Sequence, residues 1–180
     1  TTVLMADEVF DHEGSAGRAL PHTDLAIRDA DGAIRRTGTG ELLVRSLATM
    51  IGYHERPEQT AEAFRDGWLH TGDLVELDAD GFITIVGRTK DMIISGGLNV
   101  YPKEIEDVIN RLPGVVEAAV VGVPHERFGE TAVAVIVTDD PDFDVAVVEA
   151  ACAEQLASYK RPRITITRAE PLPRNANAKL

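Results

Sequence analysis

The stretch from Gly87 to Pro102, which reads GRTKDMIISGGLNVYP, is the feature that most constrains how this chain folds. A strand-like run over residues 82–86 ends at Gly87, and polar or charged residues follow. A short apolar run over residues 92–94 then meets Ser95-Gly96-Gly97, where the glycines permit positive φ angles. Little in this stretch can form a continuous core. We therefore predict a junction, made of a hinge and a glycine loop that contacts a ligand.

The pattern before the junction is β-rich. It contains strand candidates at residues 24–29, 41–45, 73–77 and 82–86, and one short helix candidate at 56–64. Asp-Gly pairs, which favour tight turns, separate the strands or end the helix. This pattern predicts a barrel-like or sheet subdomain that is incomplete by itself.

The pattern after the junction is mixed. A helix is expected from Pro102, because Ile105, Val108, Ile109 and Leu112 recur at helical spacing. The later candidates are two apolar central strands, a helix capped by Asp144 and an outer strand, at residues 115–123, 131–137, 144–159 and 163–168. We predict a second unit of α+β type, a sheet with two helices, joined by the segment from Pro124 to Gly129 between its central strands.

The formal net charge of −12 argues against a nucleic-acid-binding protein, because phosphate contacts need clustered Lys and Arg. The charge is unevenly distributed. From Ser158 to Leu180 six basic residues accompany one acidic residue, so this tail carries +5 and the rest of the chain carries −17. Such a tail either binds a local anionic ligand or only solubilises a surface strand.

Several kinds of site and location can be judged from composition. No apolar run approaches the roughly 18 to 20 residues that span a bilayer, and the first residues lack a basic signal-peptide start, so we expect a cytoplasmic protein without a membrane span. The single cysteine, Cys152, lies in an apolar helical pattern and is expected in the core rather than as a nucleophile. The five histidines lack metal-ligand spacing, so no zinc site is predicted.

Two residues suit a ligand that carries hydroxyl groups. Asp73 follows a Thr-Gly turn at a strand start, where its carboxylate could accept two hydrogen bonds from ribose hydroxyls or could merely cap the turn. Arg88 lies fifteen residues later, at the far end of a predicted hairpin. The two could therefore reach one ligand, and a structural ion pair between them is the competing interpretation.

Two further features suit an anionic ligand. Gly96 and Gly97 could present backbone N–H groups to an anion or a carbonyl, or form only a turn. They lack the spacing of a phosphate-binding P-loop, and no GxGxxG motif occurs. Lys179 lies on an irregular terminal segment, from which it could enter a cleft and stabilise a negative transition state, or remain solvated.

The motifs WLHTGD, GRTKDMIISGGLNVYPKEIE, VVGVPHERFGE, SYKRPR and LPRNANAK, taken in this order, resemble the adenylate-forming superfamily. Within it they resemble the AMP-forming acyl-CoA synthetases, with wording nearest to malonyl-CoA and other short- or medium-chain synthetases. The resemblance begins at about Gly14. It implies an α+β fold in which residues 1–89 form the β-rich, distorted barrel-like end of a large N-terminal domain. Residues 90–180 would form a small α+β lid domain with a central sheet and flanking helices.

The resemblance also implies a two-step ligase reaction. A small-molecule carboxylic acid attacks the α-phosphate of Mg²⁺-bound ATP, which gives an acyl-adenylate and pyrophosphate, and coenzyme A (CoA) then displaces AMP. Both steps would use one site between the large domain and the lid. The expected partners are thus the carboxylic acid, ATP, CoA and the rest of the large domain.

Individual residues take roles from this resemblance. Asp73 would bind the ribose with Arg88 as its companion, Lys90 would be the hinge about which the lid rotates, and Lys179 would be the catalytic lysine. The residues matched to CoA binding are Gly96, Gly97, Phe128, Tyr159, Arg161 and Arg163.

The sequence departs from the family pattern in several places. The phosphate loop and the Mg²⁺-binding motif are absent, and Ala178 stands directly before Lys179, where a Gly-Lys pair is usual. We therefore expect the C-terminal portion of a longer enzyme that is inactive alone. The alternatives are an adenylation domain that delivers its product to a carrier-protein thiol and a non-catalytic nucleotide-binding fragment.

Overall fold

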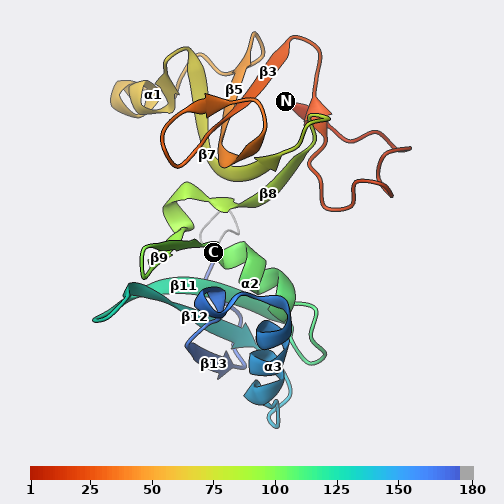
Figure 1. The fold of residues 1–180 in the computed structure, drawn as a ribbon, viewed down its shortest axis with the longest axis vertical. Helices are drawn as coiled ribbons and strands as arrows, with labels where there is room; N and C mark the ends of the chain where they lie inside the picture. Colours follow the sequence, from red (N-terminus) through yellow and green to blue (C-terminus); the bar gives the residue numbers. More distant parts are fainter. Residues whose placement is uncertain (175–180) are drawn as a thin grey trace. The chain divides into compact units, whose positions relative to one another are not determined.

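The computed structural model describes residues 1–174, which form both helices and strands and confirm the α+β class (Figure 1). The chain divides after Lys90 into two compact units. A short 3-10 helix, η1 (Thr89–Asp91), spans the division. The predicted catalytic Lys179 lies outside the described residues.

The first unit is built on one six-stranded sheet of antiparallel pairs, in the order β4-β3-β5-β7-β6 with β8 also paired to β7. The sheet strands are β3 (Thr23–Arg28), β4 (Ile34–Arg35), β5 (Gly38–Ser46), β6 (Phe64–Arg65), β7 (Trp68–Leu77) and β8 (Ile83–Arg88). The other elements are β1 (Thr2–Val3), β2 (Arg18–Ala19) and the helix α1 (Pro57–Ala63). The sheet is not closed into a barrel.

Apolar side chains alternate between the two faces of this sheet, as the two-residue repeat of a strand requires. One face carries the larger core, which contains Leu25, Ile27, Val44, Val75, Leu77 and Ile83. The opposite face carries Ala26, Leu43 and Trp68. The guanidinium carbon of Arg45 lies 4.4 Å from the centre of the Trp68 ring, so an arginine covers part of this second cluster.

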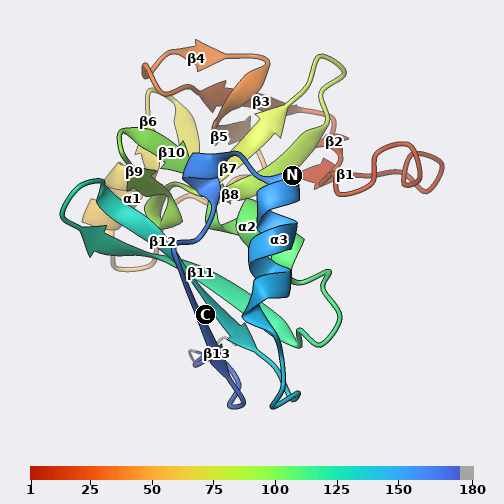
Figure 2. The ribbon, with the colours of Figure 1, turned by 60° about the horizontal axis from the view of Figure 1, so that its bottom comes forward.

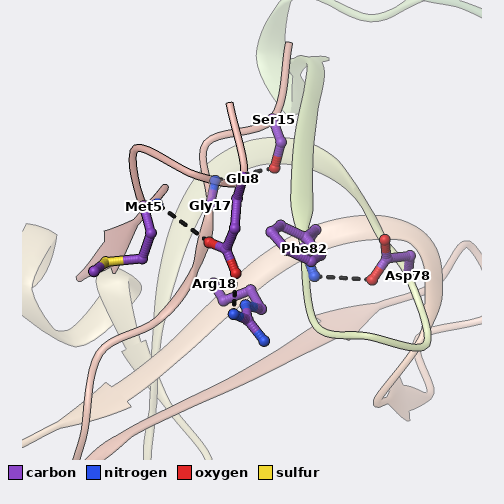
Figure 3. Close-up of polar contacts among 7 residues, drawn as sticks. All are labelled: Met5, Glu8, Ser15, Gly17, Arg18, Asp78 and Phe82. Carbon is purple, nitrogen blue, oxygen red and sulfur yellow. Dashed lines mark hydrogen bonds and ion pairs between the residues drawn. The ribbon is translucent and has the colours of Figure 1, made fainter. Parts of the chain in front are cut away.

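The irregular segment between β1 and β2 is held by side-chain contacts (Figure 3). Ser15 Oγ donates a 2.9 Å hydrogen bond to a backbone carbonyl of β8 and accepts one from the N–H of Gly17 at 3.0 Å. Glu8 forms an ion pair with Arg18. Gly17 has a φ of +85°, and a Cβ there would lie 2.1 Å from a backbone carbonyl carbon of β1, so the close approach requires glycine.

The second unit contains a five-stranded sheet with two helices (Figure 2). Its strand order is β10-β9-β12-β11, and β13 pairs in parallel with β12. The elements are β9 (Ile93–Ser95), β10 (Leu98–Val100), α2 (Pro102–Ile109), β11 (Glu117–His125), β12 (Gly129–Val137), α3 (Val145–Gln155), the 3-10 helix η2 (Ser158–Lys160) and β13 (Ile164–Arg168).

Helices α2 and α3 contact each other and share one core with the sheet (Figures 1 and 2). The predicted helical stripe of α2 is buried at Ile105, Val108 and Ile109. Helix α3 begins where expected, because the side chain of Asp144 accepts a 2.9 Å hydrogen bond from the N–H of Ala146. Cys152 is 1% exposed, which confirms its place in the core. Burial raises the pKa of its thiol and disfavours the nucleophilic thiolate.

The predicted link between the two central strands is too long. The link between the central strands was expected from Pro124 to Gly129, but the pairing of β11 with β12 includes Pro124 with Glu130 and His125 with Gly129. A proline lacks the N–H that a central strand donates, but β11 is an edge strand, where that loss is tolerated. The connection is therefore only three residues long.

Candidate functional site

Asp73 and Arg88 lie opposite each other on neighbouring strands, β7 and β8. Nε of Arg88 is 3.1 Å from Oδ1 of Asp73, and the two side chains are 47% and 30% exposed, Arg88 being the more exposed. The ion pair anticipated as the competing interpretation is thus present. An ion pair this exposed contributes only about 0–1 kcal/mol to stability. Stabilisation of the fold therefore does not explain why these two residues are present.

Irregular strand pairing surrounds Asp73 on both sides. Between the pairs His70–Leu43 and Leu74–Glu41, three residues of β7 oppose a single residue of β5. On the other side, Val86 is the extra residue in the pairing of β8 with β7. Such bulges bend a strand and redirect its side chains, and they are frequent next to binding sites. The Asp73 side chain is therefore presented by an interruption of the sheet.

Side-chain hydrogen bonds stabilise this interruption. Thr71 Oγ1 donates to the carbonyl of Leu42 at 3.0 Å and accepts from the N–H of Asp73 at 3.1 Å. Gly72 has a φ of +72°, which suits glycine. A hollow of about 420 Å³ adjoins the turn, and its lining residues are Thr71, Gly72, Arg88, Thr89 and Lys90. The predicted hinge residue and the predicted ribose-side arginine therefore border the same space.

Glu41 is a residue that the sequence analysis did not single out. Its Oε2 lies 2.8 Å from Nδ1 of His70, and its Oε1 accepts a 3.3 Å hydrogen bond from the N–H of Gly72. The His70 and Glu41 side chains are 5% and 16% exposed. The sequence pattern that could have pointed to Glu41 is its position directly before the apolar run Leu42–Val44. A charge that enters the interior of a sheet needs hydrogen-bond partners.

Gly96 and Gly97 form the two-residue turn between β9 and β10. Their φ angles are +61° and +80°, the combination that tight hairpins need and that favours glycine at both positions. The N–H of Gly96 donates a 2.8 Å hydrogen bond to the backbone carbonyl of Phe128. A Cβ at Gly97 would meet open space, so that side of the turn is accessible.

A carboxylate also attaches the Gly96-Gly97 turn to the sheet. Glu130 Oε2 accepts a 2.9 Å hydrogen bond from the N–H of Ile94. The backbone pairing of β9 with β12 is short and joins Ser95 to Gly129. The glutamate side chain thus reinforces the attachment of a hairpin that has little ladder pairing with β12.

Phe128 and Arg163 come together beside this turn. The guanidinium carbon of Arg163 lies 4.2 Å from the centre of the Phe128 ring, and that of Arg127 lies 5.3 Å from it. The imidazole of His125 is 4.9 Å from the same ring. This cluster places an aromatic ring and two arginines next to Gly96, a combination that suits an anion with an aromatic group.

Arg161 and Tyr159 have other surroundings. Nε and Nη2 of Arg161 donate to the carbonyls of Leu156 and Ala153, at 3.0 and 2.9 Å. These carbonyls lie at the C-terminal end of α3, where a cation stabilises the helix. Tyr159 is 39% exposed, and Nζ of the neighbouring Lys160 lies 5.8 Å from its ring. The structure thus gives Arg161 a structural contact, while its predicted role in CoA binding stays a prediction.

Glu106 on α2 has a carboxyl group whose pKa is raised. Its Oε1 accepts a 2.8 Å hydrogen bond from the N–H of Val120 on β11. Burial raises the pKa of this carboxyl, and the nearby Asp107 and Asp91 raise it further, against the lowering effects of the Val120 hydrogen bond and Lys103. The charged form therefore costs free energy in the folded state.

We predict that Glu106→Gln makes the second unit more resistant to rising pH. Because the folded pKa lies above the unfolded one, the folded state binds more protons in the interval between them, and stability falls as pH rises through that interval. Glutamine keeps an acceptor for Val120 without the charge. Native-state hydrogen exchange of the Val120 amide measures this effect. The gain in protection of Glu106→Gln over the parent chain should be greater at about pH 7 than at about pH 4. Equal differences at both pH values, or a similar effect of the control Glu149→Gln at an exposed position of α3, would contradict the prediction.

Comparison with known proteins gives a consistent picture. The family model for the AMP-binding enzyme C-terminal domain matches residues 104–179. The chain is 46% identical over 179 residues to the long-chain-fatty-acid–CoA ligase FadD13 of Mycobacterium tuberculosis. This alignment covers 99% of this chain and 35% of the relative. It is 42% identical over 170 residues to a long-chain-fatty-acid–CoA ligase of Escherichia coli, with 94% and 30% covered.

Solved structures agree with these sequence matches. The o-succinylbenzoate CoA synthetase MenE of Bacillus subtilis, in complex with the acyl-adenylate intermediate OSB-AMP, has a TM-score of 0.91 and 36% identity, with 99% of this chain and 37% of that chain covered. ATP-bound MatB of Rhodopseudomonas palustris has a TM-score of 0.83 and 43% identity, with 93% and 34% covered.

These matches identify a member of the adenylate-forming superfamily. Within that superfamily the chain is similar to relatives named as acyl-CoA ligases, and its residues 104–179 match the C-terminal domain of AMP-binding enzymes. It spans about a third of the length of the relatives it matches. None of the helices within residues 1–174 has both the length and the apolar character that crossing a bilayer requires.

Proposed function

We propose that this chain contributes the ribose-binding strands and the lid of an ATP-dependent acyl-CoA synthetase. In the first step a carboxylate oxygen attacks the α-phosphorus of ATP, and the bond to the β-phosphate oxygen breaks to release pyrophosphate. In the second step the CoA sulfur attacks the acyl carbonyl carbon, loses its proton, and AMP leaves. The observation that carries the proposal is the Asp73–Arg88 pair, presented by two bulges beside a hollow.

The nucleotide would occupy the side of the first unit that carries Asp73. The carboxylate has acceptor capacity beyond its contact with Arg88 and can take hydrogen bonds from two ribose hydroxyls. Arg88 and Lys90 line the adjoining hollow and supply positive charge toward phosphate. MenE of Bacillus subtilis, a structural neighbour, has been solved with ATP and a magnesium ion and also with AMP, which supports nucleotide binding.

The acyl acceptor would be CoA, bound by the turn at Gly96 and Gly97 and by the Phe128–Arg163 stack. A thin pantetheine arm needs close backbone approach, which the accessible side of Gly97 permits. The arginine–aromatic stack suits a phosphorylated adenine nucleotide. The names of the relatives as CoA ligases favour CoA over a carrier-protein thiol.

The remaining roles are also proposals. Lys90 would be the hinge between the two steps, and Lys179, which lies outside the described residues, would contact the reacting carboxylate and phosphate. Mg²⁺ would accompany ATP. Residues 1–174 hold no group of three or more His, Cys, Asp or Glu side chains placed to bind a metal. A cytoplasmic location stays a prediction.

The acid that the enzyme activates is not assigned by its relatives. Their names include long-chain fatty acids, o-succinylbenzoate and a substituted indenyl-propanoate. The motif sequences are most similar to those of synthetases for malonate and other short- or medium-chain acids. An acid of this kind stays a prediction. We expect the 180 residues alone to be inactive, because the phosphate loop and the Mg²⁺ motif are absent from them.

Arg163→Ala tests whether the acceptor is CoA. In the complete enzyme this change should raise the KM for CoA about tenfold, because it removes a cation from the Phe128 stack, and should leave carboxylate-dependent pyrophosphate exchange unchanged. Arg111→Ala, on the exposed surface after α2, is the matched control and should change neither quantity. An unchanged KM for CoA in Arg163→Ala would instead support a carrier-protein acceptor.

A further inference from the structure

We propose that Glu41 is a positioning residue for the nucleotide-binding carboxylate, acting through His70 and Gly72 on the turn that carries Asp73. The inference rests on the proposed function, in which Asp73 binds the ribose. It assigns a role to a residue on β5, a strand that carries none of the predicted site residues. The role follows from the two contacts that the carboxylate oxygens of Glu41 make, one with His70 and one with Gly72.

The Glu41 carboxylate joins the residues on either side of Thr71. One oxygen is 2.8 Å from Nδ1 of His70, and the other accepts from the N–H of Gly72 at 3.3 Å. Since an ionised carboxylate only accepts hydrogen bonds, His70 donates through Nδ1. The adjacent Leu42 carbonyl accepts from the Thr71 hydroxyl at 3.0 Å. Three consecutive residues of β7 are therefore bound to two consecutive residues of β5.

These contacts replace the regular pairing that the bulge removes. At this point three residues of β7 oppose one residue of β5, so the usual ladder cannot fix where the turn lies. Gly72, with a φ of +72°, makes the backbone here more flexible, because glycine has no Cβ to restrict its φ and ψ angles. Without an acceptor at position 41, the Gly72 N–H and the buried His70 would lose their partner.

The turn is directly connected to the ribose-binding group. Gly72 is bonded covalently to Asp73, and the Asp73 N–H donates to the Thr71 hydroxyl at 3.1 Å. A shift of the Gly72 peptide therefore moves the Asp73 carboxylate relative to Arg88. Hydrogen bonds to two ribose hydroxyls depend steeply on position, so a displaced carboxylate would lose one or both.

The test compares ATP with 2′-deoxy-ATP in carboxylate-dependent pyrophosphate exchange by the complete enzyme. The measured quantity is the ratio of kcat/KM for the two nucleotides. This ratio is obtained on one preparation, so a variant that is partly unfolded loses the same fraction for both nucleotides. A purely structural role for Glu41 would leave the ratio unchanged.

We expect Glu41→Ala to lower the preference for ATP about tenfold, the size of one lost charge-assisted hydrogen bond. Glu41→Gln preserves side-chain volume and one acceptor oxygen, so it should lower the preference only about threefold, and it serves if the alanine variant does not fold. Glu76→Ala, an exposed carboxylate on β7, is the control and should leave the ratio unchanged. The double variant Glu41→Ala/Asp73→Ala should show no lower preference than Asp73→Ala alone.

Two results separate the inference from the function on which it rests. If Asp73→Ala retains the full preference for ATP, the ribose assignment is wrong, whatever Glu41 does. If Asp73→Ala abolishes the preference while Glu41→Ala and Glu41→Gln both retain it, the ribose assignment stands and the positioning role of Glu41 is overturned.

Discussion

Replacing Asp73 by alanine is expected to lower kcat/KM for ATP in the adenylation step about a hundredfold or more. The change removes the acceptor of two hydrogen bonds from ribose hydroxyls, and a hydrogen bond to a charged group contributes about 1.5–3 kcal/mol. Since about 1.4 kcal/mol corresponds to a factor of ten, losing both accounts for at least this effect. Carboxylate-dependent pyrophosphate exchange in the complete enzyme measures it.

The fold should survive this change. The ion pair with Arg88 is substantially exposed and contributes little to stability, so circular dichroism and the thermal midpoint should differ only slightly from those of the parent enzyme. Asp73→Asn retains one acceptor oxygen and should lose less activity than Asp73→Ala. Glu76→Ala on the same strand should leave kcat/KM for ATP unchanged. A loss in Glu76→Ala equal to that in Asp73→Ala would show that the assay reports general damage to β7.

Spacing in the sequence was sufficient to relate Asp73 to Arg88. Strands before and after an Asp-Gly turn predict a hairpin, and residues near its two open ends must lie across from each other, as these two do. The bulges on either side of β7 could not be predicted in this way. They depend on which residues of three strands are paired, and alternation of apolar residues looks the same with or without an extra residue.

The missed role of Glu41 has the same origin. Its partners His70 and Gly72 lie about thirty residues away in the chain, and only the β5–β7 pairing brings them together. Arg161 illustrates a local limit. A basic cluster in the sequence suggested an anionic ligand. In the structure the chain turns after the end of α3, and the Arg161 guanidinium donates to carbonyls at that helix end. Charge composition alone does not distinguish these two uses.

Replacing Lys90 by proline is expected to separate the two steps of the reaction. Lys90 lies in η1 at the division between the two units, where the proposed rotation of the lid would change the backbone angles. Proline fixes φ near −65° and also restricts Thr89, so it should hinder passage between two backbone states. We expect thioester formation to slow at least about tenfold and pyrophosphate exchange to change by less than about threefold.

A matched substitution distinguishes the backbone from the side chain. Lys90→Ala removes the charge that borders the hollow but leaves the backbone free to rotate. It should therefore affect the two steps to similar extents, and less than proline affects the thioester step. If Lys90→Ala slowed thioester formation as strongly as Lys90→Pro, the lysine charge rather than the hinge would explain the result.

The most direct test of the account measures both half-reactions in the complete enzyme, on one preparation each of the parent and of Lys90→Pro, with acids of short, medium and long chain. We predict that the parent shows carboxylate-dependent pyrophosphate exchange without CoA and releases AMP with acyl-CoA when CoA is added. Lys90→Pro should keep the exchange and lose most of the CoA-dependent step. A parent enzyme that exchanges no pyrophosphate with any of these acids, or a Lys90→Pro variant in which both steps fall equally, would contradict the account.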